Sequence, residues 1–312
     1  MRILVTGGAG FIGSHIVEHF HETAAVRVLD NLRSGFKHNL SGLRHEFVEG
    51  SILNQGAVRR AVQGVDYVFH LAAIISVPES MENPIDCNTI NAIGSLIVLE
   101  EAAKAGVKKL VLSSSAAVYG DNPATPKVET MLPEPRSPYA ITKLDGEFYC
   151  KLFSDKGRLQ TASLRYFNVF GPRHDPGSQY AAAVPAFIDR ALKNEPITIF
   201  GDGEQTRDFI YVKDVVAANA FFATESKATG VFNVAYGRRI TINDLAKTIC
   251  RLTGSRSVIK HAAERPGDVK HSLASIDKLR AAGFAPAGDF DDGLAATVDF
   301  FRKRANSAAT RN

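Results

Sequence analysis

Residues 1–30 read MRILVTGGAGFIGSHIVEHFHETAAVRVLD, an apolar run, a glycine-rich segment and a second apolar run that ends at Asp30. This order predicts a strand, a tight turn, a helix and a second strand. Glycines in such a turn let the backbone approach a diphosphate closely, and the start of the following helix favours negative charge. We therefore expect a dinucleotide-binding unit, although the glycine spacing is GxxGxxG rather than GxGxxG.

Asp30 stands at the end of the second predicted strand. A carboxylate there can accept hydrogen bonds from the adenosine ribose and repels a 2′-phosphate, which favours NAD over NADP. Arg33 leaves the NADP alternative open, because a guanidinium could bind a 2′-phosphate.

The composition is that of an ordinary soluble globular protein, with 312 residues, 45% of them hydrophobic and 22% charged. No window approaches the roughly 18 apolar residues that a membrane helix needs, so we expect no membrane association. The first strand follows Met1 and Arg2 directly, which argues against a cleavable signal peptide. The cysteines Cys87, Cys150 and Cys250 are widely spaced and fit a reducing, cytoplasmic location without a bound metal.

The charge balance argues against a nucleic-acid partner. The net charge is +4, and a basic cluster at residues 302–304 accounts for much of it. No stripe of basic and aromatic residues accompanies this cluster, so we interpret it as a solvated helix end.

Strands and helices alternate along the first half of the chain. We predict further strands at residues 46–49, 65–71, 109–114 and 162–165, and helices at residues 55–62, 87–105 and 139–153, with Gly106 as a helix stop. Such alternation indicates an α/β fold, a Rossmann-like doubly wound parallel sheet. After residue 167 the pattern breaks, and a smaller, partly interleaved C-terminal lobe begins. Residues 207–234 again resemble a βα unit that can return to the large sheet.

Three serines and a Tyr/Lys pair are the candidates for chemistry. Residues 113–115 are serines at the end of a predicted strand, where open α/β sheets bind ligands. Tyr139 and Lys143 are four residues apart, so they share one face of a helix. A neighbouring ammonium favours the phenolate and should lower the pKa of Tyr139 toward that of a usable base. His70, also at a strand end, is better explained as a core histidine than as a catalyst.

Several segments together resemble the extended short-chain dehydrogenase/reductase family, and within it the NAD-dependent nucleotide-sugar 4-epimerases. The segments are residues 6–13, 71–73, 113–120, 139–143, 165–172, 201–203, 207–209 and 265–268. The resemblance covers nearly the whole chain. It implies an NAD-binding Rossmann domain at residues 1–167, rejoined by about 207–234, and a UDP-sugar-binding lobe at 168–312, mainly 168–206 and 235–305.

The resemblance also implies roles for single residues. Tyr139 would be the base on the sugar 4-hydroxyl, Lys143 would hold the nicotinamide ribose, and Ser115, with Ser114 beside it, would bond the reacting oxygen. The implied NAD contacts are Gly7, Gly10, Phe11, Ile12, Gly13, Asp30, Asn31, Ser51, Ile52, Leu71, Ala72, Ala73, Ser113, Tyr139, Lys143 and Tyr166. The implied UDP-sugar contacts are Ser76, Ser115, Tyr139, Asn168, Val184, Arg207, Arg265, Asp268 and Ser272.

Among these contacts, Asn168, Arg207 and Arg265 are similar to diphosphate ligands, and Asp268 to the carboxylate that contacts the uridine ribose. The chemistry agrees, because a diphosphate needs amide and cationic donors.

Two positions depart from the family pattern. Residues 50–52 read Gly-Ser-Ile where the family commonly has Gly-Asp and a branched apolar residue, which weakens the expected contact with the adenine. Residues 116–118, after Ser115, read Ala-Ala-Val and lack the acidic residue that dehydrating or decarboxylating relatives usually place there. This difference argues against a dehydratase or a decarboxylase.

The leading hypothesis is therefore an NAD-dependent UDP-sugar 4-epimerase. The small Ser272 would leave room for an N-acetyl group, which favours UDP-GlcNAc and UDP-GalNAc, alongside UDP-Glc and UDP-Gal. Alternatives are a UDP-sugar dehydrogenase or reductase, an epimerase restricted to UDP-Glc and UDP-Gal or acting on a UDP-uronic acid, and a non-enzymatic dinucleotide sensor.

The family resemblance further implies a homodimer, formed by helices 87–105 and 139–153 of both chains. Ile90, Ile93, Ile97 and Phe148 are candidate seam residues, although packing inside the monomer explains these positions about as well.

Overall fold

The computed structural model describes residues 1–177, 182–264 and 270–309 of the chain. Its centre is a parallel sheet of seven strands in the order β11-β6-β5-β4-β1-β2-β3. The strands are β1 (Arg2–Thr6), β2 (Ala25–Asp30), β3 (Glu46–Glu49), β4 (Tyr67–His70), β5 (Lys109–Ser115), β6 (Gln160–Tyr166) and β11 (Gly230–Val234). The expected doubly wound α/β fold is confirmed.

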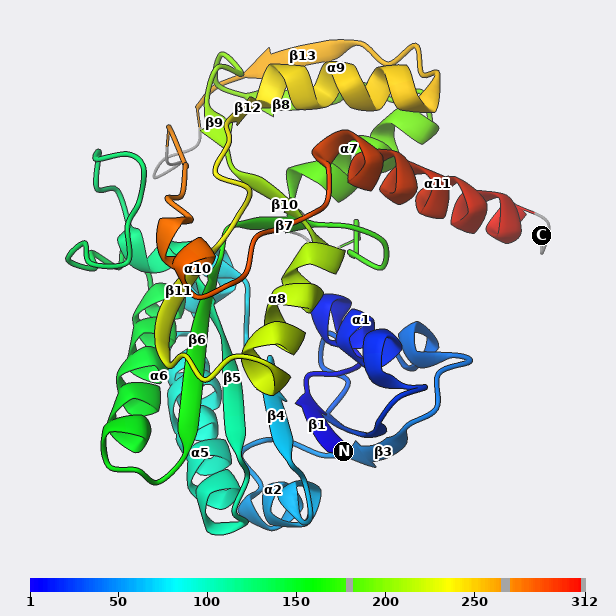
Figure 1. The fold of residues 1–312 in the computed structure, drawn as a ribbon. Coiled ribbons are helices and arrows are strands. Elements are labelled where there is room, and N and C mark those ends of the chain that lie inside the picture. The colour runs from blue at the N-terminus through cyan, green and yellow to red at the C-terminus, as the bar shows by residue number, and fades with distance from the viewer. Residues whose placement is uncertain (178–181, 265–269, 310–312) are drawn as a thin grey trace.

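Helices cover both faces of this sheet (Figure 1). On one face lie α1 (Phe11–Phe20) and α8 (Val212–Thr224), and on the other lie α2 (Gln55–Val62), α5 (Gly94–Lys104) and α6 (Pro138–Asp155). Along β1, Ile3 and Val5 pack into the core under α1 and α8, and Leu4 packs into the core under α2 and α5. Successive side chains of a strand point to opposite faces, so a strand covered on both sides needs the continuous apolar run found here.

The predicted return to the sheet is confirmed. β10 (Phe209–Tyr211) leads into α8, and β11 then pairs with β6 from Gly230 opposite Ala162 to Val234 opposite Tyr166.

A second lobe packs around its own apolar core at the top of Figure 1. Its elements are α7 (Ala183–Leu192), β8 (Ile197–Phe200), α9 (Ile242–Thr253), β13 (Ile259–Ala262) and α11 (Phe290–Ala309). Short strands β7 (Asn168–Phe170), β9 (Thr206–Arg207) and β12 (Ile240–Thr241) link the two lobes, with β7 pairing with β10 and β9 with β12. The remaining helical elements are η1 (Lys37–Leu40), α3 (Val77–Glu82), α4 (Pro84–Asn88), η2 (Thr89–Ile93), η3 (Ala116–Tyr119) and α10 (Asp277–Ala281).

Some element boundaries differ from the prediction. The helix expected at 87–105 is three segments, because α4 is followed by the π-helical turn η2 before α5 begins. The strand expected at 65–71 covers only Tyr67–His70, and β5 extends to Ser115. Gly106 has a φ of +71° and ends α5 as expected.

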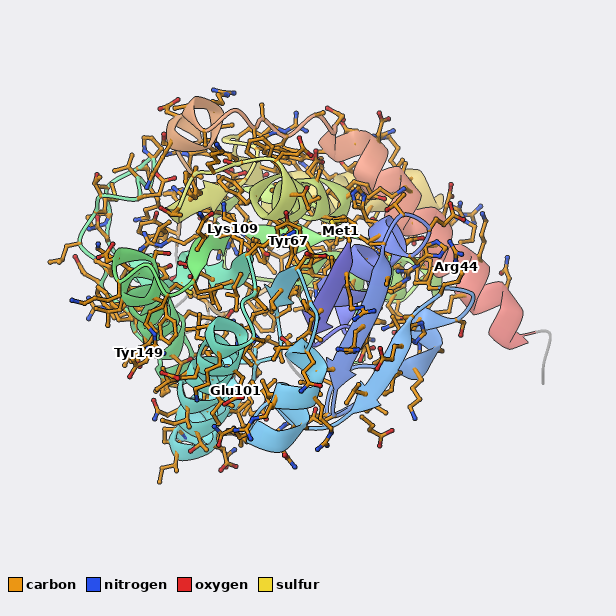
Figure 2. All side chains as sticks on the ribbon, turned by 60° about the horizontal axis from the view of Figure 1, so that its bottom comes forward. Met1, Arg44, Tyr67, Glu101, Lys109 and Tyr149 are labelled. Atoms are coloured by element: carbon orange, nitrogen blue, oxygen red, sulfur yellow. The ribbon has the colours of Figure 1, made fainter. Side chains whose placement is uncertain are left out.

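All strands of the sheet run in one direction, which defines where a ligand can bind. Figure 2 is viewed toward the amino ends of the strands, where Met1, Tyr67 and Lys109 lie beside one another. The glycine-rich turn and the serines of β5 follow the carboxyl ends, at the opposite edge of the sheet. Open α/β sheets bind ligands at that edge.

Candidate cofactor and catalytic site

The glycines after β1 are required by close packing. Gly7 has a φ of +71°, and a Cβ there would lie 2.8 Å from the backbone nitrogen of Ala72. A Cβ at Gly13 would lie 2.2 Å from the carbonyl oxygen of Gly7. The turn therefore packs tightly against the residues after β4, and the first turn of α1 packs against the glycine-rich turn. The start of α1 lines the cavity, where its backbone N–H groups can bind an anion.

A cavity of about 430 Å³ opens next to this turn. Fourteen of the residues expected to contact ligand line it, and they are Gly7, Gly10, Phe11, Ile12, Gly13, Asp30, Asn31, Ser51, Ile52, Leu71, Ala72, Ala73, Ser76 and Ser113. The cavity therefore has the position, the glycine cradle and the helix start that a dinucleotide requires.

Asp30 and Arg33 bear on the choice of dinucleotide. The Asp30 carboxylate is 7% exposed and accepts hydrogen bonds from the backbone N–H groups of Ala9 (2.9 Å) and Leu32 (2.7 Å), which fix its orientation. Arg33 Nη2 lies 2.8 Å from Glu79 Oε1, so a carboxylate of this chain already pairs with the guanidinium. Both observations fit the unphosphorylated ribose of NAD.

Ser51 and Ile52 occupy the position where the sequence departs from the family pattern. Ser51 Oγ accepts a hydrogen bond from the Leu53 N–H at 3.2 Å, within a local turn. Ile52 is buried and packs so closely on α5 that a Cβ at Gly94 would lie 2.6 Å from its Cδ1. Ile52 therefore supplies an apolar wall, and the Ser51 hydroxyl is engaged by its own loop.

Tyr139, Lys143 and Ser115 come together where α6 meets the end of β5. Ser137 caps α6 by accepting a hydrogen bond from the Ala140 N–H at 3.2 Å, which places Tyr139 in the first turn. Ser115, whose Oγ accepts a hydrogen bond from the Ala117 N–H at 3.1 Å, lies near the Tyr139 side chain and lowers its pKa. Lys143 Nζ donates to the Ser113 carbonyl at 2.9 Å and lies 5.7 Å from the centre of the Tyr139 ring. Tyr139, Lys143 and Ser115 do not themselves line the cavity, but they lie next to Ser113, which does and whose carbonyl holds Lys143.

The expected effect of Lys143 on Tyr139 is corrected by the structure. Burial raises the pKa of Tyr139, and the nearby Ser115 offsets this only in part. Burial also lowers the pKa of Lys143 to about 8. Removal from water therefore governs both pKa values and favours the neutral form of each side chain.

Ser114 is placed away from the expected catalytic group. Because side chains alternate along β5, Ser114 points to the face opposite Ser113 and Ser115. It is 2% exposed, and its hydroxyl donates to Glu147 Oε1 at 2.5 Å. Arg165 holds the same carboxylate through two hydrogen bonds of 2.8 and 2.7 Å. This geometry gives Ser114 a structural role, and the predicted catalytic role is wrong.

Tyr166 and His70 are both buried and do not line the cavity. The Tyr166 hydroxyl donates to Asn219 Oδ1 at 3.0 Å, so this group is already engaged inside the protein, and the expected contact with NAD stays a prediction. His70 is 1% exposed between Thr6 Oγ1 (2.7 Å) and Ser95 Oγ (2.9 Å), and burial lowers its pKa to about 3. It is the neutral core histidine that the sequence favours.

The structure places the expected sugar-nucleotide residues in different surroundings. Ser76 lines the cavity and caps α3 by accepting a hydrogen bond from the Glu79 N–H at 3.2 Å. Asn168, Arg207 and Ser272 gather where β7, β9 and the segment after residue 270 run together. The Asn168 N–H donates to the Asp208 carbonyl at 3.1 Å, and the Ser272 N–H to the Thr206 carbonyl at 3.0 Å.

Val184 is 2% exposed and packs in the core of the second lobe, so its side chain does not face the cavity. Arg265 and Asp268 lie outside the residues that the structure describes.

The sequence prediction missed one part of the cavity wall. Arg173, His174 and Asp175 line it from the second lobe, directly after residues 165–172, which we assigned from the sequence to the family pattern without any contact to the dinucleotide beyond Tyr166. The signal was weak, because no local pattern shows that a turn between lobes folds back over a helix far away in the sequence.

The parallel sheet, the glycine cradle and the neighbouring Ser/Tyr/Lys group define a short-chain dehydrogenase/reductase of the extended type. The model of the "NAD dependent epimerase/dehydratase family" matches residues 3–235, and the chain belongs to this family. NAD is accordingly its cofactor.

The chain is also similar to individual enzymes that are named for UDP-sugar substrates. A solved UDP-N-acetylglucosamine 4-epimerase from Methanobrevibacter ruminantium M1, in complex with UDP-N-acetylmuramic acid, is 43% identical over 97% of this chain and 98% of its own, with a TM-score of 0.94. A UDP-glucose 4-epimerase of Mycolicibacterium smegmatis is 36% identical over 97% of this chain and 99% of its own. A UDP-N-acetyl-alpha-D-glucosaminuronate decarboxylase of Bacillus cytotoxicus is 34% identical over 98% of this chain and 99% of its own.

In the part of the chain that the structure describes, no helix is both long and apolar enough to cross a membrane.

Proposed function

We propose that the protein is an NAD-dependent UDP-sugar 4-epimerase. The observation that carries this proposal is the Ser115, Tyr139 and Lys143 group beside a cavity built for a dinucleotide. The epimerases among the relatives support it, since they match nearly the full length of the chain.

Each residue of the group has a defined task in this reaction. Tyr139 acts as its phenolate, which takes the proton of the sugar 4-hydroxyl and becomes the neutral phenol, and Ser115 beside it hydrogen-bonds the reacting oxygen. Lys143, fixed by the Ser113 carbonyl, holds the ribose next to the reacting carbon. The bound NAD supplies the hydride acceptor at C4 and the hydride donor in the return step. After the 4-keto sugar turns over, Tyr139 returns the proton and no net oxidation results.

The second lobe must hold the nucleotide while the sugar rotates. We assign this task to Asn168, Arg207, Arg265 and Asp268, whose amide, guanidinium and carboxylate groups suit a diphosphate and a ribose. The substrates we infer are UDP-GlcNAc and UDP-GalNAc, together with UDP-Glc and UDP-Gal, because Ser272 is small. We place the reaction in the cytoplasm, where the three free thiols stay reduced.

A decarboxylase is the second candidate, because one relative carries that name. The segment after Ser115 argues against it. η3 consists of Ala116–Tyr119 and contributes no carboxylate beside the reacting group.

Incubating the purified protein with one UDP-sugar and no added nicotinamide tests the proposal. We expect slow conversion to an equilibrium mixture of the two C4 epimers, followed by NMR of the sugar. Turnover that requires stoichiometric added NAD or NADH would contradict the epimerase and favour a dehydrogenase or reductase. Release of carbon dioxide from a UDP-uronic acid would favour the decarboxylase.

A further inference from the structure

A turn of the second lobe lies across the glycine-rich turn of the first. It spans residues 171–175, after β7, and its residues Arg173, His174 and Asp175 share the dinucleotide cavity with Gly10 and Phe11. Arg173 has a φ of +65°, a conformation that residues other than glycine seldom adopt. Backbone strain of this kind is kept where the surroundings enforce it, commonly at a functional site.

Side chains of α1 anchor this turn. Arg173 Nη2 lies 3.2 Å from Glu18 Oε2. The buried His15 donates from Nε2 to the Pro172 carbonyl at 2.9 Å and lies 3.1 Å from the same Glu18 oxygen through Nδ1. The hydrogen bond from His15 and the attraction of Arg173 hold the pKa of Glu18 at about 2, so the carboxylate stays charged near neutral pH. The turn is thus fixed to the helix whose start faces the cavity.

His174 is the residue of this turn that still has hydrogen-bonding capacity. Its ring stacks on Phe11, with ring centres 4.3 Å apart and planes at 13°. Its Nδ1 atom is buried and has no hydrogen-bond partner among the described residues. Among the described residues, the other buried side-chain atoms without a partner belong to Arg165 and Gln205, which do not line the cavity. Because a buried polar atom without a partner is costly, a bound ligand is the natural partner for His174.

The charge state of His174 fits such a contact. Burial lowers its pKa to about 4, so the ring is neutral at neutral pH and offers one N–H donor and one acceptor nitrogen.

We propose that residues 171–175 form a clasp over the cofactor, in which His174 Nδ1 binds the dinucleotide beside the glycine-rich turn. Glu18 and Arg173 are positioning residues that hold the clasp shut. The clasp rests on the NAD dependence of the family and not on the identity of the sugar. Its consequence is that a segment of the sugar-binding lobe retains the cofactor throughout the two hydride steps.

The rate of NAD release from the purified holoenzyme tests the role of His174. Released NAD is trapped with excess alcohol dehydrogenase and ethanol, and the NADH formed is followed by fluorescence. His174→Phe keeps an aromatic ring but removes the nitrogen, so we expect release to become about 5–20-fold faster. His174→Ala also loses the stacking and should be faster again, by about 3-fold or more.

His174→Gln restores a hydrogen-bonding end and should stay within about 3-fold of the parent. A folded His174→Phe protein that purifies without NAD counts as support, with folding judged by circular dichroism. Release from His174→Phe at the parental rate overturns the proposal.

Glu18→Gln tests the anchor, with Glu195→Gln as the matched control. Glu195 pairs with Arg190 at the exposed end of α7, away from the cavity. We expect Glu18→Gln to release NAD about 3–10-fold faster with the KM for the UDP-sugar unchanged, and Glu195→Gln to behave as the parent. Equal release from both variants contradicts the clasp. NAD release requires no sugar, so this result and the outcome of the epimerase test stand independently.

Discussion

The end of β5 shows how neighbouring residues acquire different tasks. Ser113 lines the cavity, Ser115 lies near Tyr139, and Ser114 between them faces the buried Glu147 and Arg165. The sequence predicted the three serines as a group, because a hydroxyl at a strand end is visible in a motif. The sequence alone did not show that the strand continues past Ser114, because β5 ends at Ser115, one residue later than predicted. Ser114 therefore lies inside the strand, where side chains alternate between faces.

The same limit applies to the acidity of Tyr139. The YxxxK spacing correctly predicted that Tyr139 and Lys143 are neighbours on α6. It could not show that both side chains are buried, and burial is what raises the pKa of Tyr139.

Tyr139→Phe removes the proposed base and changes little else. We expect kcat for epimerisation to fall by at least about 1,000-fold, because general-base catalysis contributes up to about four orders of magnitude. NAD bound per protein, measured by absorbance after denaturation, should stay at the parental value. A variant with more than about a tenth of the parental kcat would assign the proton transfer to another group.

Ser272→Tyr tests the inferred sugar preference. Overfilling a packed wall costs on the order of 1–3 kcal/mol, so we expect kcat/KM for UDP-GlcNAc and UDP-GalNAc to fall about 10-fold or more. Activity on UDP-Glc and UDP-Gal in the same preparation is the control and should stay within about 3-fold. Equal loss of both activities, or a parent without acetylated turnover, contradicts the role of Ser272.

At the scale of elements, local sequence patterns predicted the bounds of helices and strands well. They did not predict the breaks that contacts with distant residues cause. α2 and β3 have the predicted bounds, because a cap at Asn54 and a compact apolar run are local signals. The π-helical turn η2 was missed, since it interrupts a continuous apolar pattern where Asn91 bonds the backbone of Ile74 at 2.7 and 2.9 Å. Contacts between residues far apart in the sequence set such a break.

The packing of α2 against α5 depends on a buried carboxylate. Glu101, labelled in Figure 2, is 2% exposed and accepts hydrogen bonds from Arg59 Nε (2.9 Å) and Gln55 Nε2 (2.8 Å). These partners lower its pKa to about 2. A carboxyl group with a lowered pKa stabilises the fold above its ordinary value of 4.5, and the stabilisation is lost as pH falls toward 2.

Glu101→Gln should therefore lower the free energy of unfolding by about 1–3 kcal/mol at pH 7, the value of hydrogen bonds to a charged group. The difference from the parent should shrink as the pH falls below about 4.5. Thermal unfolding at several pH values measures it. Glu100→Gln is the control, because Glu100 is 33% exposed and its pairs with Arg158 and Lys104 should contribute less than about 1 kcal/mol. A pH-independent difference for Glu101→Gln would show that shape rather than charge matters there.

At the scale of the whole molecule, one outer face remains apolar. Ile141, Phe148 and Leu152 lie along α6 at helical spacing and are 46%, 57% and 54% exposed, and Ile93 of η2 is 47% exposed. Of the other expected seam residues, Ile90 and Ile97 pack partly into the monomer core. An exposed apolar stripe on adjoining helices is typical of an interface between subunits.

We therefore expect a homodimer in solution through the α6 face, and Phe148→Asp should split it. The aspartate would place a charge in the centre of the buried stripe, a position at which like charges of two chains would meet. Light scattering at micromolar protein should give twice the chain mass for the parent and the chain mass for Phe148→Asp. Val258→Asp is the matched control, because Val258 is also an exposed apolar residue, at 61%, but lies beside β13 in the other lobe. This control should remain dimeric, and a monomeric parent would show that the apolar stripe serves another contact.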